Sequence, residues 1–173
     1  MKVEVLRYPS EVDWLRCKQL ALNTVWLKST KVPDENWRYD ILASGHSPIR
    51  TLPFTVRLEI PYWVSVHLVR HKIGVEHYVS SQRNDRQDKY DRTKAPQDAT
   101  VIHIMDMDAE AVINISHKRL CKLASKETRE AWQEVCREIS AVCPWIAPSL
   151  VPMCQFRGGV CTEFKPCGGK TDD

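Results

Sequence analysis

The clearest pattern of apolar and polar positions lies between residues 52 and 60, where apolar side chains occupy every second position. A period of two predicts a strand with one buried face. Weaker alternation over residues 3–7 predicts a short first strand that ends before Pro9, and the run 75–79 predicts another. The expected strands are therefore few, short and separated by helical segments.

Helix signals stand between these strands. Ser10 with Asp13 three residues later forms a capping-box pattern and predicts a helix over residues 12–26. Pro61 fits the first turn of a second helix that reaches residue 71, with Gly74 as its stop. Between residues 109 and 142, apolar positions spaced by three, four or seven predict at least one long amphipathic helix. Its apolar positions are Leu120, Ala124, Ala131, Val135, Ile139 and Val142, and Cys143, Pro144 and Trp145 end it.

Together these elements predict an α/β (α+β) fold, with a mixed β-sheet flanked by helices. A chain of 173 residues favours a single domain, which we expect over residues 1–150. Residues 85–98 are polar and predict a loop. The segment 151–173 is rich in cysteine, glycine and proline, and its periodicity predicts no regular element.

Composition narrows the class of protein. A hydrophobic fraction of 43% with 27% charged residues is ordinary for a soluble globular chain. The sequence contains neither the apolar run of a signal peptide nor a stretch long enough to span a membrane, so we expect a cytoplasmic protein. The net charge of +3 is too small to predict nucleic-acid binding, but residues 70–94 hold seven Lys/Arg against four Asp/Glu. That segment could attract a phosphorylated ligand.

Three short motifs offer candidate chemistry. Gly45 and His46 precede the strongest predicted strand, Arg70, His71 and Lys72 close the second predicted helix, and a group of serine and arginine residues follows it. That last group comprises Ser80, Ser81 and Arg83. Arginine and histidine at a helix end can donate hydrogen bonds to a phosphate or a ring carbonyl, and an arginine beside hydroxyls offers another anion site. The alternative is a basic helix end that simply faces solvent.

The order of these motifs resembles the signature half of flavin-dependent thymidylate synthases. In that family a Gly-His segment leads into a strand, a helix begun by proline ends in Arg-His-Arg, and a serine follows after seven residues. Here the corresponding residues run from Gly45 to Arg83. A second stretch matches the family's C-terminal helix in its spacing: Asn114, Arg119, Ala124, Glu127, and then Cys143, Pro144 and Trp145.

The sequence departs from the family at several positions. Lys72 stands in place of the second arginine, and Tyr78 in place of a glutamate two residues before the signature serine. Gln82 replaces an arginine, although one inserted residue would let Ser81 and Arg83 supply the serine-arginine pair. Where the family has Asn-Ala-Arg, this chain has Asp108, Ala109 and Glu110.

The resemblance implies a homotetramer in which several subunits build each site. FAD would be reduced by NADPH, and dUMP would be converted to dTMP with methylenetetrahydrofolate as the carbon donor. The flavin would be held by His46, Arg70, His71, Lys72 and Asn114. The substrate dUMP would be held by Ser80 or Ser81, Arg83 and Arg119, with Arg119 as the catalytic residue near the pyrimidine carbonyls. The alternatives are a diverged member with a different one-carbon reaction and a pyrimidine-nucleotide-binding protein without catalysis.

The cysteines and tryptophans are interpreted separately from the family resemblance. Four cysteines could form a zinc site that anchors the tail, although their spacing lacks the paired two-residue gaps of common zinc sites; they are Cys143, Cys154, Cys161 and Cys167. Reduced structural thiols and disulfides are the alternatives. The six tryptophans are expected in the core or at subunit contacts rather than as platforms that stack bases.

Overall fold

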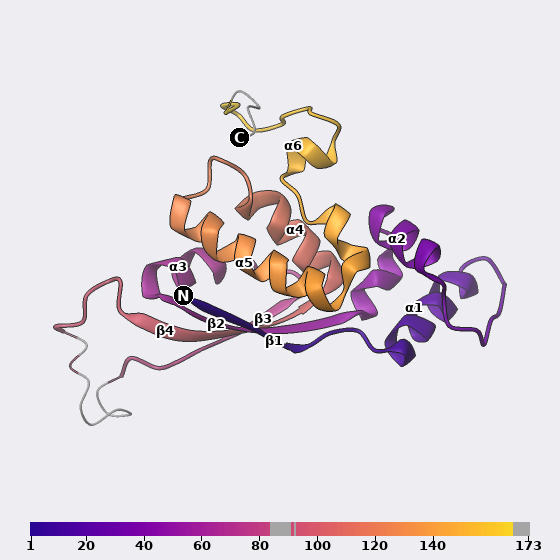
Figure 1. Cartoon of the computed structure of the whole chain (residues 1–173), viewed down its shortest axis with the longest axis horizontal. Coiled ribbons are helices and arrows are strands. Elements are labelled where there is room, and N and C mark those ends of the chain that lie inside the picture. Colours follow the sequence, from indigo (N-terminus) through magenta and orange to yellow (C-terminus); the bar gives the residue numbers. More distant parts are fainter. Residues whose placement is uncertain (84–90, 92, 168–173) are drawn as a thin grey trace.

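The protein is described by a computed structural model over residues 1–83, 91 and 93–167. One antiparallel sheet of four strands organises it, in the order β1-β2-β4-β3 (Figure 1). The strands are β1 (Lys2–Arg7), β2 (Pro53–Pro61), β3 (Val75–Val79) and β4 (Thr100–Asp108). The combination of helices with one sheet is confirmed. The expected mixed sheet is corrected, because every strand pair is antiparallel.

The two central strands build the core side of the sheet. On β2 every second side chain is buried, as the alternation predicted, and these are Phe54, Val56, Leu58 and Ile60. Their partners on β4 are Met107, Met105, His103 and Val101, which are also buried. His103 is therefore a polar group in an otherwise apolar layer, and it must find hydrogen-bond partners there.

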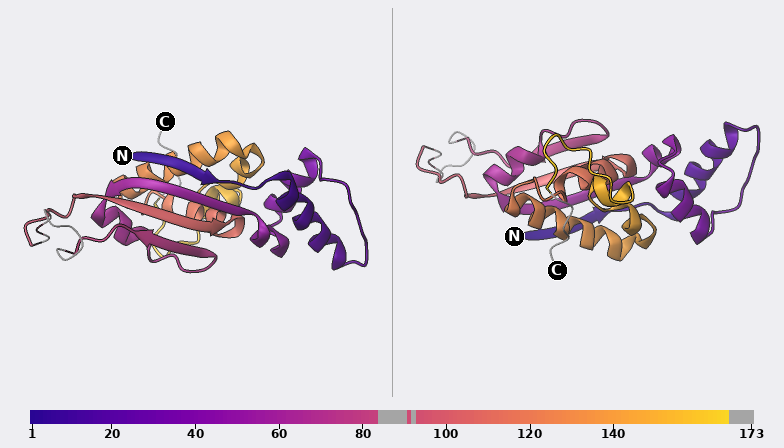
Figure 2. Two further views of the ribbon diagram at one scale, coloured as in Figure 1. Left: turned by 90° about the horizontal axis from the view of Figure 1, so that it is seen from below. Right: turned by 90° about the horizontal axis from the view of Figure 1, so that it is seen from above.

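Helices cover one face of the sheet. Figures 1 and 2 show α3 (Tyr62–Leu68), α4 (Ala109–Arg119) and α5 (Lys126–Val142) on that face, with α1 (Glu11–Asn23) and α2 (Glu35–Ala43) at one end of the sheet. Short turns named η1 (Ser47–Thr51) and η3 (Pro144–Ser149) follow α2 and α5, and α6 (Met153–Phe156) lies in the tail. None of the helices in the described part of the chain is long and apolar enough to cross a membrane.

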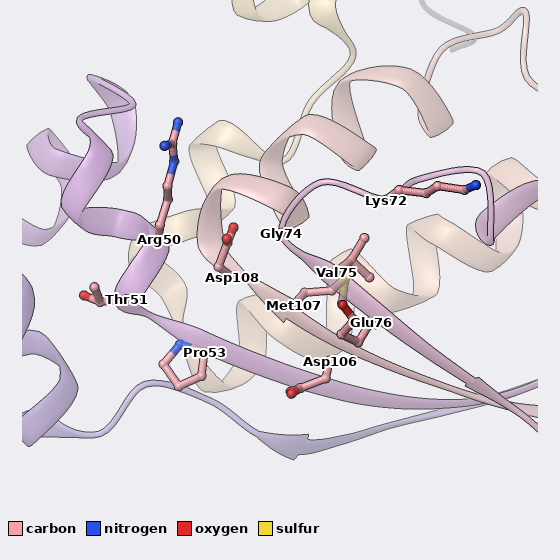
Figure 3. A pocket seen from close by; sticks show the side chains of 10 residues that line it. All are labelled: Arg50, Thr51, Pro53, Lys72, Gly74, Val75, Glu76, Asp106, Met107 and Asp108. Atoms are coloured by element: carbon pink, nitrogen blue, oxygen red, sulfur yellow. The ribbon is translucent and has the colours of Figure 1, made fainter.

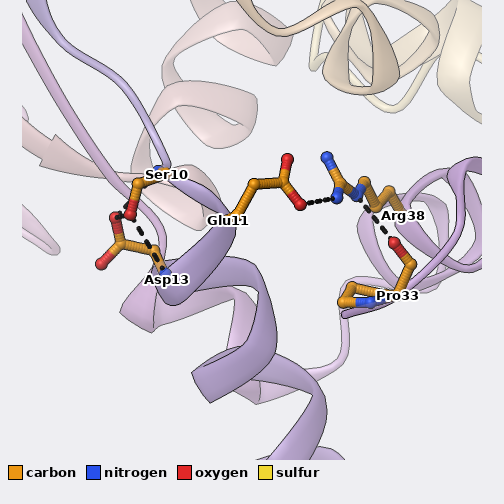
Figure 4. Close-up of polar contacts among 5 residues, drawn as sticks. All are labelled: Ser10, Glu11, Asp13, Pro33 and Arg38. Atoms are coloured by element: carbon orange, nitrogen blue, oxygen red, sulfur yellow. Dashed lines mark hydrogen bonds and ion pairs between the residues drawn. The ribbon is translucent and has the colours of Figure 1, made fainter. Parts of the chain in front are cut away.

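Local signals explain where α1 begins and how α2 is held against the core. The Ser10 hydroxyl accepts from the Asp13 amide while the Asp13 carboxylate accepts from the Ser10 amide, so the predicted capping box is confirmed (Figure 4). Arg38 of α2 is buried, with its guanidinium over the rings of Trp14 and Trp145, which contact each other edge to face, and it donates to Glu11 at 2.5 Å. A guanidinium can stack on aromatic faces while its edge keeps hydrogen bonds.

Several boundaries differ from the predictions. The second predicted helix ends at Leu68, so Arg70, His71 and Lys72 lie in the loop beyond it. The predicted long helix is divided into α4 and α5 by a turn that begins at Leu120. Strand β4 and helix α2 were not predicted. Half of the predicted loop 85–98 lies outside the described residues, and its described residues, 91 and 93–98, form no helix or strand.

Five of the six tryptophans lie in or against the core, one of the two places expected for them, and the sixth is exposed. Trp14 and Trp132 are fully buried, and Trp132 donates from Nε1 to the Ser116 hydroxyl at 2.9 Å. Trp37, Trp63 and Trp145 pack against the core. Trp26 is 96% exposed, in the segment between α1 and α2. Its φ of 58° is a backbone conformation that side chains with a Cβ rarely adopt.

Candidate functional site

The loop after α3 and the last residue of α4 meet through His71 and Arg119. The Nε of Arg119 donates to Nε2 of His71 at 2.7 Å, and its NH2 group donates to the backbone carbonyl of His67 at 2.8 Å. Arg119 lies 48 positions after His71 and 52 positions after His67 in the chain. The fold therefore joins the two stretches that carry the family resemblance.

Burial and charge set the protonation of this pair. Burial first, then the positive charge of Arg119 and the neighbouring His77, lower the pKa of His71 to about 4. Burial, and then Arg70, also lower the pKa of Arg119, although an arginine stays charged at any ordinary pH. His71 is consequently a neutral imidazole that accepts from Arg119 on Nε2 and carries its proton on Nδ1.

Neither arginine of this group has a carboxylate partner in the part of the chain that the structure describes. Arg119 is half-buried and bonds only to an imidazole and a carbonyl, while Arg70 is exposed and close enough to influence both Arg119 and His67. Glu127 acts electrostatically on His67 but forms no ion pair with either arginine. Two cations beside a neutral histidine form a suitable site for an anion.

Lys72 does not join the Arg119 and His71 contact but lines a separate pocket of about 310 Å³, shown in Figure 3. Its lining also includes Arg50, Gly74, Asp106 and Asp108, and the Lys72 side chain points away from Arg50 and Asp108. Burial, more than any other cause, raises the pKa of Asp108. Its Oδ1 accepts from a backbone amide of the first turn of α4 at 2.7 Å and so caps that helix. With acidic residues in its wall, this pocket is less suited to an anion than the Arg119 site.

Ser80 and Arg83 line a third hollow, a pocket of about 600 Å³ at the end of β3. The Ser80 amide donates to the Ile102 carbonyl at 2.8 Å, and its hydroxyl accepts from the Ile102 amide at 3.1 Å. Ser80 therefore extends the pairing of β3 with β4, and its hydroxyl proton is left to donate. Ser81 is exposed, and its hydroxyl accepts from the Arg83 amide at 3.2 Å.

The other two predicted cofactor residues are exposed. His46 precedes η1 and makes no capping hydrogen bond, and Asn114 projects from the middle of α4. The structure thus brings together His71 and Arg119, with Arg70 nearby. It distributes the remaining predicted site residues over separate surfaces of one chain.

Sequence reasoning missed a chain of buried polar groups behind His71. His77 Nε2 lies 2.6 Å from the His71 carbonyl oxygen, and His77 Nδ1 lies 2.9 Å from His103 Nε2. His103 Nδ1 lies 3.1 Å from the Ser65 hydroxyl. Burial first, then the charge of His77, lower the pKa of His103 to about 4. Because these histidines are far apart in sequence, only the pairing of β3 with β4 could have revealed the contact.

The cysteines show no metal site in the described residues. All seven are free thiols, and no group of three or more potential ligands is placed to hold a metal ion among residues 1–83, 91 and 93–167. Cys143 is buried, which raises its pKa to about 11 and favours the protonated thiol over a thiolate ligand. The tail cysteines Cys154, Cys161 and Cys167 are half-buried.

Comparison with models of known protein families gave no match, and a search of curated proteins found no similar sequence.

Proposed function

We propose that this protein binds a pyrimidine nucleotide at Arg119 and acts in the cytoplasm as a flavin-dependent thymidylate synthase-like methyltransferase. The observation that carries the proposal is the contact of Arg119 with His71, beside Arg70 and without a carboxylate partner in the described part of the chain. A half-buried cation without a counter-charge gains most from an anionic or strongly polar ligand. The substrate dUMP offers both a phosphate and ring carbonyls.

Arg119 has a chemical role in this proposal. Its charge would lie near the pyrimidine carbonyls and stabilise the enolate-like electron density that makes C5 nucleophilic towards the carbon unit of methylenetetrahydrofolate. His71 would add its Nδ1–H as a neutral donor. A neutral donor suits a carbonyl oxygen, because it adds no further charge beside two arginines.

The same donors partly fit FAD. The flavin carbonyls and phosphates accept hydrogen bonds, which Arg70 and His71 can donate, and the bound flavin would supply hydride transfer with electrons from NADPH. His46, Lys72 and Asn114 lie outside that donor set. A complete flavin site would therefore require residues from a second copy of the chain. This requirement supports the proposed homotetramer.

The second candidate is a pyrimidine-nucleotide-binding protein without catalysis. The carboxylates of Asp108 and Glu110 favour it, because they stand where the resembling family has its flavin-contacting Asn-Ala-Arg. Glu110 already neutralises Arg50 at 2.6 Å. A flavin phosphate near these two carboxylates would be repelled.

The decisive experiment measures flavin and nucleotide separately. Purified protein is examined for absorbance near ~450 nm with and without added FAD, and dUMP is titrated by calorimetry into wild type, Arg119→Ala and the control Arg137→Ala. Arg137 forms only exposed ion pairs on α5. Loss of one charge-assisted contact should weaken dUMP binding roughly ten- to a hundredfold in the first variant and leave the control unchanged.

The outcomes separate the two candidates. Flavin uptake with dUMP binding supports the methyltransferase, and dUMP binding without flavin supports the binding protein. Equal dUMP affinity in wild type and Arg119→Ala, with only a lower melting temperature, would show that Arg119 is structural.

A further inference from the structure

Behind the proposed site, four residues from four segments are joined by a continuous series of hydrogen bonds, which we call the relay. Ser65 lies on α3, His103 on β4, His77 on β3 and His71 in the loop between α3 and β3. Ser65 and His103 are fully buried, and His77 is half-buried. The relay therefore runs from the core towards the loop that carries the candidate ligand-binding residues.

The chemistry of each group fixes the direction of donation. A carbonyl oxygen only accepts, so His77 must carry a proton on Nε2 to bond with the His71 carbonyl. In a neutral His77 the other nitrogen, Nδ1, is then an acceptor for Nε2–H of His103. His103 Nδ1 in turn accepts the proton of the Ser65 hydroxyl. All three hydrogen bonds of this relay donate in one direction, towards His71.

His71 is held from the opposite side as well. Its ring accepts at Nε2 from Arg119, and its own amide donates to the Leu68 carbonyl at 3.0 Å. The relay from His77 thus secures the backbone of the residue, and Arg119 secures its ring. Among contacts with the described residues, the Nδ1–H of His71 is its one polar group without an assigned role.

We propose that His77 and His103 are positioning residues, which hold the His71 carbonyl so that the His71 ring accepts from Arg119 and presents Nδ1–H to a carbonyl oxygen of the bound ligand. The identity of that ligand rests on the proposed function. The hydrogen-bond arrangement itself does not. Without the relay, the loop would lose its anchor to β3, and His71 and Arg119 would no longer constrain each other.

The arrangement can be tested without a ligand by recording imidazole ¹⁵N signals of the full chain at pH 7. We expect the Nδ1–H form for His71 and the Nε2–H form for both His77 and His103. In His77→Phe the two His71 nitrogens should move towards the average of exchanging tautomers. An Nε2–H form of His71 in wild type, or His71 signals that do not change in His77→Phe, would overturn the proposal.

A second measurement asks whether the positioning affects binding. The dUMP affinity of His77→Phe should fall about tenfold, as expected for loss of one hydrogen bond that orders the site. His77→Gln keeps a donor for the His71 carbonyl and should recover part of the affinity. His117→Phe removes another buried histidine, outside the relay, and is the matched control. An affinity that falls equally in His77→Gln and His77→Phe would contradict the role of this hydrogen bond.

His103→Phe provides an independent variant that leaves the contact of His77 with the carbonyl in place. It should lower dUMP affinity by less than His77→Phe does, because His77 loses only the partner that orients it. If wild type itself does not bind dUMP, the proposed function fails, while the ¹⁵N pattern still decides whether the relay exists.

Discussion

Replacing Gly74 with alanine should be unusually destabilising, because two independent constraints meet at this residue. Its φ of +69° lies in the left-handed region, and an added Cβ would lie only 2.5 Å from Oδ2 of Asp108 and 2.9 Å from its Cγ. Asp108 is also bound there, since its amide donates to the Gly74 carbonyl at 2.9 Å. The backbone of Asp108 is therefore fixed, and its carboxylate can move aside only by giving up the cap of α4.

The magnitude follows from these two constraints. The left-handed backbone costs a residue with a Cβ about 1–2 kcal/mol. If the carboxylate must leave its capping position, the lost cap costs a further 0.5–2 kcal/mol, as is typical of such caps (~1 kcal/mol on average). The free energy of unfolding should thus fall by roughly 1.5–4 kcal/mol. For a chain of this size the melting temperature should fall by about 3–16 °C.

Gly45→Ala is the matched control. Gly45 has a φ of +61°, but no atom lies within 4 Å of the added Cβ. It should show only the backbone cost of about 1–2 kcal/mol. Urea denaturation of both variants, with the slope of the unfolding curve compared to wild type, measures the difference.

A double variant isolates the contact. In an Asp108→Ala background the cap is already lost, so adding Gly74→Ala should cost no more than Gly45→Ala costs in wild type. If Gly74→Ala and Gly45→Ala are equally destabilising in the wild-type background, the reasoning about Asp108 is wrong.

Three further predictions follow from buried groups. His117 is buried and packs against Phe156 with ring centroids 4.6 Å apart. Among the described residues its nitrogens have only a weak contact with the Ser149 backbone and no hydrogen bond of ordinary geometry, so His117→Phe should raise the free energy of unfolding by about 1–3 kcal/mol in urea denaturation. The pKa values of His71 and His103 fall from 6.5 to about 4 on folding, so the stability they contribute is complete above pH 6.5 and is lost as the pH falls to about 4. For the fully buried His103 this amounts to about 3 kcal/mol, at 1.36 kcal/mol for each pKa unit, and melting temperatures across that pH range test it. Arg38→Met should lower the melting temperature by a few degrees, because it removes the guanidinium that lies over two tryptophan rings, and an unchanged value would show that this contact contributes nothing.

Strong local signals were enough to predict part of the fold. The alternation on β2 and the capping box at Ser10 are each set by neighbouring residues, so the sequence alone identifies them. Strand β4 was missed because the usual rule of apolar side chains inside and polar side chains outside is reversed near its centre. His103 is buried on the core face, whereas Ile102 is partly exposed on the opposite face. A local count of apolar positions cannot recognise a polar residue that is buried because it has partners elsewhere.

The candidate site likewise contains some features that the sequence predicted and others that it could not. The sequence identified Arg119 and His71 as residues of interest through their spacing within two motifs, and the family resemblance and proposed reaction remain predictions. It could not show that Lys72 lies in a pocket apart from its neighbour His71, because the helix was expected to reach residue 71 and instead ends at Leu68.

The contact between Arg119 and His71, and the relay through His77 and His103, were decided by tertiary structure alone. The sequence supplied the residue types and the strands and helices that carry them. Only the antiparallel pairing of β3 with β4, and the packing of α3 and α4 on the same face of the sheet, placed side chains from distant positions within hydrogen-bond distance. Hydrogen bonds require distances near 3 Å, and such distances between remote residues follow from how the elements pack rather than from the pattern within any one of them.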